Sequence, residues 1–255
     1  MRSFIDINSD MGEGFGAYTI ADDKNLLKVV SSANIACGFH AGDPRIMAST
    51  VEKAIENGVG IGAHPSFPDL NGFGRRDMDL TPWEVTTDVL YQLGALSAFV
   101  RSSNYRLQHI SPHGRLGNLS VNNRNYAEAI AEAVMLFDPS LIVMTEPGQL
   151  ATVAQENGLK IAIQMFADRS YKEDGTLVSR IEPNAVIYDQ DEVVARCVRM
   201  AVEGKVQTIT GKDIEVNGHT LCVHGDTEGS VLLAKKVKQA LLEEGIEVKK
   251  LEDWL

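Results

Sequence analysis

The sequence predicts a single α/β domain of 255 residues, built as an irregular TIM-like (β/α)7 barrel. Seven short apolar runs alternate with longer amphipathic segments from one end of the chain to the other. Polar residues follow nearly every apolar run, which favours a closed barrel, because an open sheet gathers its ligand-binding groups at one switch point. The Gly-rich segment at 12–16, GEGFG, lacks the spacing of a dinucleotide fingerprint, and we find no phosphate loop.

The seven apolar runs are expected to be parallel strands. They are nearly continuous in hydrophobicity rather than strictly alternating, as strands covered by helices on their outer face need to be. They span residues 3–7, 33–37, 59–63, 107–111, 141–145, 161–166 and 220–224. An additional strand is considered at 205–210.

The amphipathic segments between these runs are predicted to be helices with recognisable starts. Asp43 and Pro44 give an N-cap and a first-turn proline to a helix that stops at Gly58. Thr81 and Glu84 form a capping box ahead of the next helix. The remaining helices are expected at 125–137, 147–157, 190–203 and 229–244.

Composition excludes several classes of function. The balance of 24 basic and 35 acidic residues gives a net charge of −11, which argues against nucleic acid or an anionic membrane as a partner. Three widely spaced cysteines are expected to be buried reduced thiols, so we expect a cytoplasmic protein. The N-terminus has no signal-peptide pattern and no run is long enough to span a bilayer. No linker divides residues 1–255, so we expect one domain that is a monomer or a homo-oligomer.

Four of the six histidines come directly after predicted strands, namely His40, His64, His113 and His224. Strand ends of a parallel barrel open on one face, so these histidines are expected to meet in one pocket. A single histidine of this kind is more often a buried structural residue, but four together favour a functional site. His109 lies inside a strand and His219 in a turn, and both are expected to be structural.

The first strand carries a second set of polar residues. Asp6, Asn8 and Asp10 alternate along it and therefore face the same side, and Glu13 follows. Buried carboxylates need a partner or a metal, so Asp10 and Glu13 are candidates for a general base or a metal ligand. A simple turn capped by Asp10 is the alternative.

The pocket is expected to take a small, anionic, polar molecule, because several arginines and a helix start lie near the predicted strand ends. Surface ion pairs explain each of these arginines equally well. The candidate substrate-binding residues are Asp6, Asn8, Asp43, Arg75, Arg76, Arg115, Asp168, Arg169, His224 and Asp226. A divalent metal on Asp10, His40 and His64 is a further expectation, weaker than a compact helical motif would give.

Five stretches of the sequence resemble the LamB/YcsF family, which contains the A subunit of bacterial 5-oxoprolinase. They are IDINSDMGEGFGAY, VSSANIACGFHAGDP, GVGIGAHPSFPDLNGFGRR, FADRSYKEDGTLVSR and CVHGD, and the resemblance runs over nearly the whole chain. It implies a seven-stranded barrel related to polysaccharide-deacetylase-like folds. It also implies ATP-dependent opening of the 5-oxoproline lactam to L-glutamate together with partner subunits B and C, with the nucleotide bound mainly by those partners.

Residue roles follow from this resemblance as a hypothesis. Asp10 or Glu13 would activate water or the ring nitrogen, and His40 and His113 would stabilise or protonate the tetrahedral intermediate. Arg75 or Arg76 would hold the substrate carboxylate. The alternatives are a metal-dependent deacetylase-type amidohydrolase and a non-catalytic protein that binds a small anion for a partner.

The chain departs from the family pattern at the fourth strand and before FADR. The family usually has a motif like KPHGALYN, whereas this chain has SPHGRLGN, with Ser111, Arg115 and Gly117 at the differing positions. Gln164 stands where the family tends to have glutamate. Loss of a mutually paired lysine and glutamate, replacement of the lysine by Arg115, and a paralogue with another substrate are three open explanations.

Overall fold

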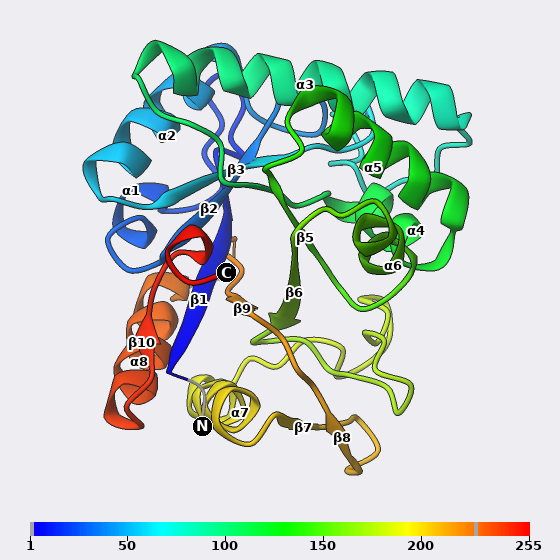
Figure 1. The fold of residues 1–255 in the computed structure, drawn as a ribbon. Coiled ribbons are helices and arrows are strands. Elements are labelled where there is room, and N and C mark those ends of the chain that lie inside the picture. The colour runs from blue at the N-terminus through cyan, green and yellow to red at the C-terminus, as the bar shows by residue number, and fades with distance from the viewer. Residues whose placement is uncertain (1–2, 227–228) are drawn as a thin grey trace.

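The computed structural model describes residues 3–226 and 229–255, and its centre is a closed barrel of seven parallel strands (Figure 1). Pairing of the first strand with the last closes the barrel, with Asp6 opposite Thr220. The fold predicted from the sequence is therefore confirmed. The barrel strands are β1 (Phe4–Met11), β2 (Ser32–Ala36), β3 (Gly60–His64), β4 (His109–Ile110), β5 (Ile142–Thr145), β6 (Ile161–Phe166) and β9 (Thr220–Cys222).

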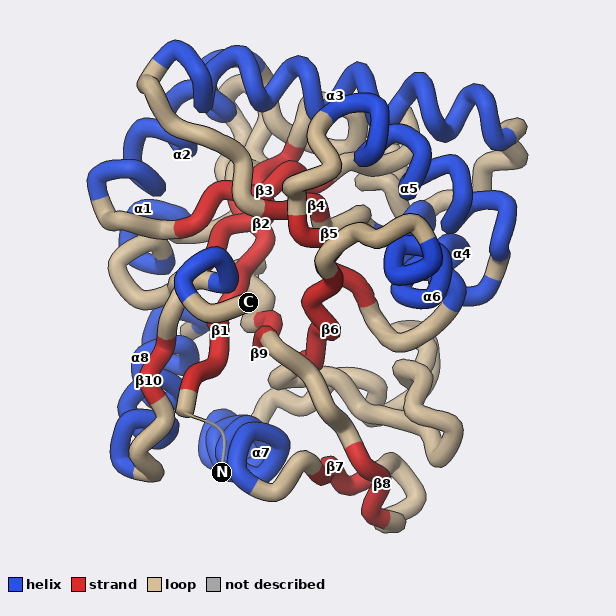
Figure 2. Tube along the Cα trace, in the orientation of Figure 1, coloured by secondary structure: helices blue, strands red, loops and turns tan. Residues whose placement is uncertain are grey.

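Helices surround the strands on all sides, as Figure 2 shows. The capping signals act as predicted: the Asp43 carboxylate accepts from the amides of Arg45 and Ile46, and Thr81 and Glu84 form a reciprocal capping box. The helices are α1 (Asp23–Leu26), α2 (Pro44–Glu56), α3 (Pro82–Ser102), α4 (Gly114–Asn122), α5 (Arg124–Phe137), α6 (Gln149–Glu156), α7 (Gln190–Val202) and α8 (Ser230–Glu243), with a short 3-10 helix η1 at Leu251–Asp253.

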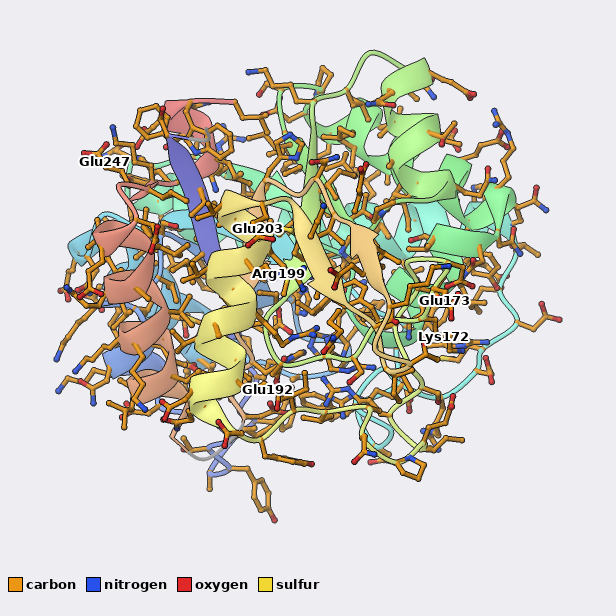
Figure 3. All side chains as sticks on the ribbon, turned by 90° about the horizontal axis from the view of Figure 1, so that it is seen from below. Lys172, Glu173, Glu192, Arg199, Glu203 and Glu247 are labelled. Carbon is orange, nitrogen blue, oxygen red and sulfur yellow. The ribbon has the colours of Figure 1, made fainter. Side chains whose placement is uncertain are left out.

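The additional strand considered at 205–210 exists in part, but outside the barrel. β7 (Lys205–Gln207) pairs antiparallel with β8 (Asp213–Glu215), and this hairpin lies next to α7. Arg199 on α7 binds Glu203 on the same helix and Asp213 on the hairpin (Figure 3). The hairpin is thus attached to the barrel through α7 and the loop after β6 rather than through the sheet.

The barrel interior is unusually polar, because inward positions of the strands carry hydrogen-bonding side chains. Ser32 donates to Asp6 at 2.7 Å, Thr220 also donates to Asp6, and the His109 Nε2–H donates to Asn34 at 2.7 Å. Alternate residues such as Ile5 and Ile7 are fully buried in the apolar core. Inward-facing and outward-facing residues of a strand therefore differ in polarity, although they alternate along the sequence.

Two glycines on β3 make room for this network. A Cβ at Gly62 would overlap the His109 ring, and one at Gly60 would lie 2.5 Å or slightly more from the Gln108 amide group. Gln108 in turn donates to Ser32 at 3.0 Å. The long side chains on and beside β4 thus occupy space that β3 leaves empty.

The C-terminal segment covers the amino ends of the barrel strands. Leu251 is fully buried against Ile142, Met144 and Ala162, with Trp254 and Leu255 packed beside it. β10 (Glu247–Val248) pairs with the start of β1, so the last residues of the chain bind to the first strand. In Figures 1 and 2 the C-terminus lies over the centre of the strands.

The three cysteines are free and buried, as predicted. Burial raises the pKa of the Cys37 and Cys197 thiols to about 12, which keeps them as unreactive thiols. Among the described residues, none of the helices combines the length and apolar character that crossing a bilayer requires.

Candidate active site

A cluster of three histidines and a glutamate occupies the carboxyl end of the barrel. Glu13, His40, His64 and His113 each place one ligand atom within 4.8 Å of the others, and their side chains are at most 10 % exposed. They come from the ends of four neighbouring strands, β1 to β4, as the sequence predicted for these histidines. Gly74 leaves space for the cluster, because a Cβ there would lie 2.9 Å from both the His40 and His113 side chains.

The hydrogen bonds of His64 define its protonation state. Its Nδ1 is 2.5 Å from the Ser111 carbonyl oxygen, so Nδ1 carries a proton. Its Nε2 faces Asp10 Oδ1 at 3.2 Å and His113 Nδ1 at 3.0 Å. Burial alone would lower the pKa of His64, but the charge and hydrogen bond of Asp10 raise it. The Asp10 carboxylate therefore favours the protonated form of His64.

His113 is the neutral acceptor in this arrangement. Its Nε2–H donates to the Phe73 carbonyl at 2.9 Å, which leaves the lone pair on Nδ1 pointing at His64. Burial, followed by the positive charge of His64, lowers the pKa of His113 to about 3. Its ring stacks on that of His40 with centroids 3.8 Å apart and planes at 6°.

Glu13 and Asp10 have opposite protonation states although they lie in the same site. Burial and then the charge of Asp10 raise the pKa of Glu13 to about 8, so Glu13 is protonated at neutral pH. Burial would also raise the pKa of Asp10, but His64 lowers it well below its usual range. The contact of Glu13 Oε1 with His40 Nε2 at 3.0 Å therefore joins two neutral groups, because burial lowers the pKa of His40.

The four-residue cluster fits a divalent metal ion of the zinc type. Three imidazole nitrogens and one carboxylate oxygen are the donor set of many zinc sites. The Ser111 and Phe73 carbonyls hold the outer nitrogens of His64 and His113, as the groups around metal ligands commonly do. His40 Nδ1 is buried and has no hydrogen-bond partner among the residues that the structure describes, so this ring still has an unused nitrogen.

A second polar group borders the cluster on the side of β6 and β9. His224 Nδ1 is 2.7 Å from Asp168 Oδ1, and Arg180 Nη2 is 2.9 Å from His224 Nε2. Since the guanidinium only donates, Nε2 accepts and the ring proton is on Nδ1. Burial would raise the pKa of Asp168, but His224 lowers it, so Asp168 is a carboxylate.

Comparison with known proteins decides the family. The model of the LamB/YcsF family matches residues 5–255. The chain belongs to the LamB/YcsF family. A protein of Alkaliphilus metalliredigens, named as the A subunit of 5-oxoprolinase, is 49 % identical over 245 residues, with 96 % of each chain covered. A protein of Natranaerobius thermophilus with the same name is 47 % identical over 251 residues, with 98 % of each chain covered.

Solved structures agree with this assignment. The lactam utilization protein of Thermus thermophilus superposes with a TM-score of 0.93 at 42 % identity, covering 97 % of this chain and all of that one. The T48 deacetylase, solved with its substrate, has a TM-score of 0.50 at 13 % identity and covers 97 % of this chain and 89 % of that one. That second likeness concerns the fold alone, and it agrees with the expected relation to deacetylase-like barrels.

In this LamB/YcsF protein the expected metal ligands His40 and His64 belong to the cluster, whereas Asp10 does not. The cluster instead contains Glu13 and His113, and Asp10 binds the ligand His64 from outside. Asp6 and Asn8 lie deeper in the barrel: Asp6 accepts from Ser31, Ser32 and Thr220, and Asn8 donates to Thr220. Their placement differs from the expected substrate contact.

Four other expected substrate-binding residues have structural partners. Asp43 caps α2 and accepts from the Gly16 amide. Arg76 binds Asp69, and Arg115 binds the exposed Asp77. Arg169 donates to the carbonyls of Val178 and Ala185 and so braces its own loop.

Arg75 and Asp226 are brought together, with Arg75 Nη2 at 3.9 Å from Asp226 Oδ2. The Arg75 guanidinium also lies 5.1 Å from the centre of the Phe73 ring, whose carbonyl holds His113. This pair is therefore close to the cluster.

The positions that depart from the family pattern have separate surroundings. Ser111 uses its backbone carbonyl to hold His64, and Gly117 is closely packed, since a Cβ there would lie 2.5 Å from the Pro112 carbonyl oxygen. The Gln164 Oε1 atom is buried, and within the described ranges 3–226 and 229–255 it has no hydrogen-bond partner. Arg115 is paired with Asp77 and so does not supply a cation to the cluster.

Sequence reasoning missed two residues of this region, Glu146 and Arg180. Glu146 directly follows β5, and burial raises its pKa to about 7. Like the histidines, it is an ionisable residue after a strand, so the same pattern could have identified it from the sequence. Arg180 comes from a long loop after β6, where no strand end marks it.

Proposed function

We propose that this protein is the A subunit of an ATP-dependent 5-oxoprolinase. Together with partner subunits B and C it would convert 5-oxo-L-proline, ATP and two water molecules into L-glutamate, ADP and phosphate. Full-length relatives that carry the name of this subunit support the proposal. Buried free thiols support a cytoplasmic location.

The observation that carries the proposal is a pair of carboxyl groups that share one site but have different partners: Asp10 Oδ1 lies 3.2 Å from His64 Nε2, and Glu13 Oε1 lies 3.0 Å from His40 Nε2. Asp10 is ionised and can accept a proton, whereas Glu13 is protonated and can donate one. Opening an amide requires both actions: a water loses a proton as it attacks, and the leaving nitrogen gains one. Environments that separate the pKa values of two carboxyl groups are a recurrent sign of such acid–base division.

The roles of the residues follow from this division. Asp10 takes the proton of the attacking water, and Glu13 gives its proton to the ring nitrogen as the carbon–nitrogen bond breaks. The His64 side chain, next to Asp10, would stabilise the negative charge of the phosphoryl group that ATP places on the former carbonyl oxygen. His64 and His113 join Asp10 to Glu13 through contacts of 3.2, 3.0 and 3.5 Å, and this path returns the proton from Asp10 to Glu13.

A lactam is a poor electrophile, so transfer of the γ-phosphoryl group of ATP to its oxygen, with release of ADP, would activate it. Addition of the first water and cleavage of the ring carbon–nitrogen bond would then leave an acyl phosphate, which the second water would cleave to glutamate and phosphate. We place the nucleotide mainly on the partner subunits, because the sequence contains no phosphate loop. The present chain would supply the water-attack and ring-opening chemistry.

The test is formation of glutamate and ADP from 5-oxoproline and ATP by this chain alone and mixed with subunits B and C from the same source. We expect equal amounts of both products, and only from the mixture. A verified complex that forms neither product would contradict the proposal. A complex that binds 5-oxoproline without turnover would indicate the non-catalytic alternative.

The donor set of the cluster favours a second candidate, a metal-dependent amidohydrolase. Glu13, His40, His64 and His113 would hold a divalent ion, which would supply Lewis-acid activation of a carbonyl. This candidate predicts stoichiometric metal in the purified protein, and hydrolysis that chelators abolish and that needs no ATP. Elemental analysis and an ATP-free assay distinguish the two candidates.

A further inference from the structure

We infer that Arg180 is the residue that binds the carboxylate of the substrate, and that His224 and Asp168 hold its guanidinium in place. This inference rests on the proposed function and assigns a residue to the recognition of 5-oxoproline. It replaces Arg75 and Arg76, the arginines that the sequence favoured for this role.

A chain of hydrogen bonds fixes the orientation of Arg180. The Asp168 carboxylate accepts from His224 Nδ1–H at 2.7 Å, and His224 Nε2 accepts from Arg180 Nη2–H at 2.9 Å. Asp168 and His224 are both buried, whereas the arginine comes from the exposed part of the loop. A buried carboxylate–histidine pair thus presents an exposed cation, much as such pairs orient metal ligands.

The strand register places this group beside the catalytic cluster. Asn8 on β1 is opposite Cys222 on β9, and Val223 N donates to Asn8 O at 2.9 Å. Asp10 and His224 each lie two residues further along these paired strands. The side chains of Asp10 and His224 therefore border the same part of the barrel mouth.

The Arg180 guanidinium has N–H donors that can still bind a ligand. In the part of the chain that the structure describes, no carboxylate lies within ion-pair distance of its guanidinium, and the contact with the neutral His224 nitrogen uses only one N–H. The planar fork of arginine matches a carboxylate, which it binds through two parallel hydrogen bonds.

The other arginines near the mouth are engaged. Arg76 and Arg115 are bound to aspartates, and Arg169 is bound to two loop carbonyls. Arg75 is near Asp226 and lies over Phe73. A substrate carboxylate would have to displace an acidic partner at three of these four, but not at Arg180.

The test measures binding of radiolabelled 5-oxoproline to the assembled complex by equilibrium dialysis without ATP. We expect Arg180→Gln to weaken binding by about 30- to 100-fold, the size expected for hydrogen bonds between charged groups. Arg180→Lys should retain part of the affinity. Arg106→Gln, which removes an arginine paired with Glu252 near the opposite end of the barrel, is the matched control and should bind as the wild type does.

An uncharged lactam makes the test specific for the carboxylate. The competitor 2-pyrrolidinone has the lactam ring without the carboxylate, so we expect the same inhibition constant for wild type and Arg180→Gln. Unchanged 5-oxoproline affinity in Arg180→Gln, or an equal loss for both molecules, overturns the inference.

The outcomes separate this inference from the proposed function. Turnover in the wild type with unchanged KM in Arg180→Gln overturns the inference and leaves the function standing. Binding that Arg180→Gln destroys, in a complex without turnover, keeps the carboxylate site and removes the function. A wild-type complex that neither binds nor converts 5-oxoproline overturns both.

Asp168 is a positioning residue in this scheme, which its own variants test. Asp168→Ala should raise KM about 10-fold with little change in kcat, since the hydrogen bond that orients His224 is lost. Asp168→Asn keeps an acceptor and should recover most of the affinity. A loss confined to kcat, or no recovery in the asparagine variant, would contradict this role.

Discussion

At the scale of single residues, His113 is the member of the cluster whose removal is most informative. Its Nδ1 lies 3.0 Å from His64 Nε2 and 3.5 Å from Glu13 Oε1, so it joins the two halves of the site. We expect His113→Ala to lower turnover of the complex by about 1,000-fold, within the range of general acid–base catalysis. The circular dichroism spectrum should not change.

The control for this variant is His219→Asn, which keeps a side-chain acceptor for the Ile163 amide at the other end of the barrel. Its turnover should match that of the wild type. Turnover of His113→Ala within twofold of the wild type would remove His113 from the mechanism.

Asp6 predicts a pH dependence of stability. Burial raises its pKa to about 6 from an ordinary value of 3.8, although Thr220, Ser31 and Ser32 oppose the shift. The stabilising contribution of protonated Asp6 is therefore complete below about pH 4 and is lost as pH rises through about 6. The loss amounts to about 3 kcal/mol.

Urea unfolding of wild type and Asp6→Asn between pH 4 and pH 7.5 measures this contribution. The free energy of unfolding of the wild type should fall by about 3 kcal/mol relative to the variant across this range. Parallel stability curves would show that Asp6 does not titrate as described.

Much of the cluster was predictable, because His40, His64 and His113 each follow an apolar strand. Glu13 was also a candidate from the sequence, but its place in the cluster instead of Asp10 was not predicted, since it depends on the turn after β1 and on the space at Gly74. The structural partners of Arg76, Arg115 and Arg169 were equally hidden, because side-chain pairing across loops leaves no periodic signal.

At the scale of elements, the space around Gly62 on β3 and around Gly94 on α3 predicts opposite effects when each glycine is replaced by alanine. A Cβ at Gly62 would displace His109 from its hydrogen bond with Asn34, and we expect Gly62→Ala to cost about 3 kcal/mol. At Gly94 in the middle of α3, such a Cβ would have no atom of the described residues within 4 Å apart from its own helix backbone, so Gly94→Ala should stabilise by about 0.5–1 kcal/mol.

Thermal unfolding of the two variants checks this contrast. The melting temperature should fall for Gly62→Ala and rise for Gly94→Ala. A tolerated alanine at position 62 would mean that the His109 ring has another place to go.

The helices and barrel strands lie close to the positions predicted from the sequence where capping signals and periodicity were strong, as for α2 and α3. α4 was missed because Gly114 and Gly117 in its first turn are poor helix formers. β7 was considered from the sequence, but its position outside the barrel was not predicted. The sequence of a short strand does not show which strand it pairs with. β10 has only two residues, which is too short for a pattern.

At the scale of the whole molecule, the C-terminal segment stabilises the end of the barrel opposite the site. Leu251→Ala should lower the free energy of unfolding by about 2–4 kcal/mol, because Leu251 is fully buried. Leu242→Ala on α8, where 45 % of the side chain is exposed, is the matched control and should cost under about 1 kcal/mol. Urea unfolding compares the two.

Turnover separates this stabilising role from catalysis. At temperatures where Leu251→Ala remains folded, its kcat should equal that of the wild type. A reduced kcat in folded protein would mean that the segment also influences the site.

The closure of the barrel by β1 and β9 has a consequence for synthesis of the protein on the ribosome. The first barrel strand is synthesised more than 200 residues before its partners β9 and β10. Until Thr220 appears, Asp6 and Asn8 lack a partner from β9, and the early part of the chain cannot complete the barrel. We therefore expect the nascent polypeptide to remain open, and exposed to chaperones and proteases, until β9 has been synthesised.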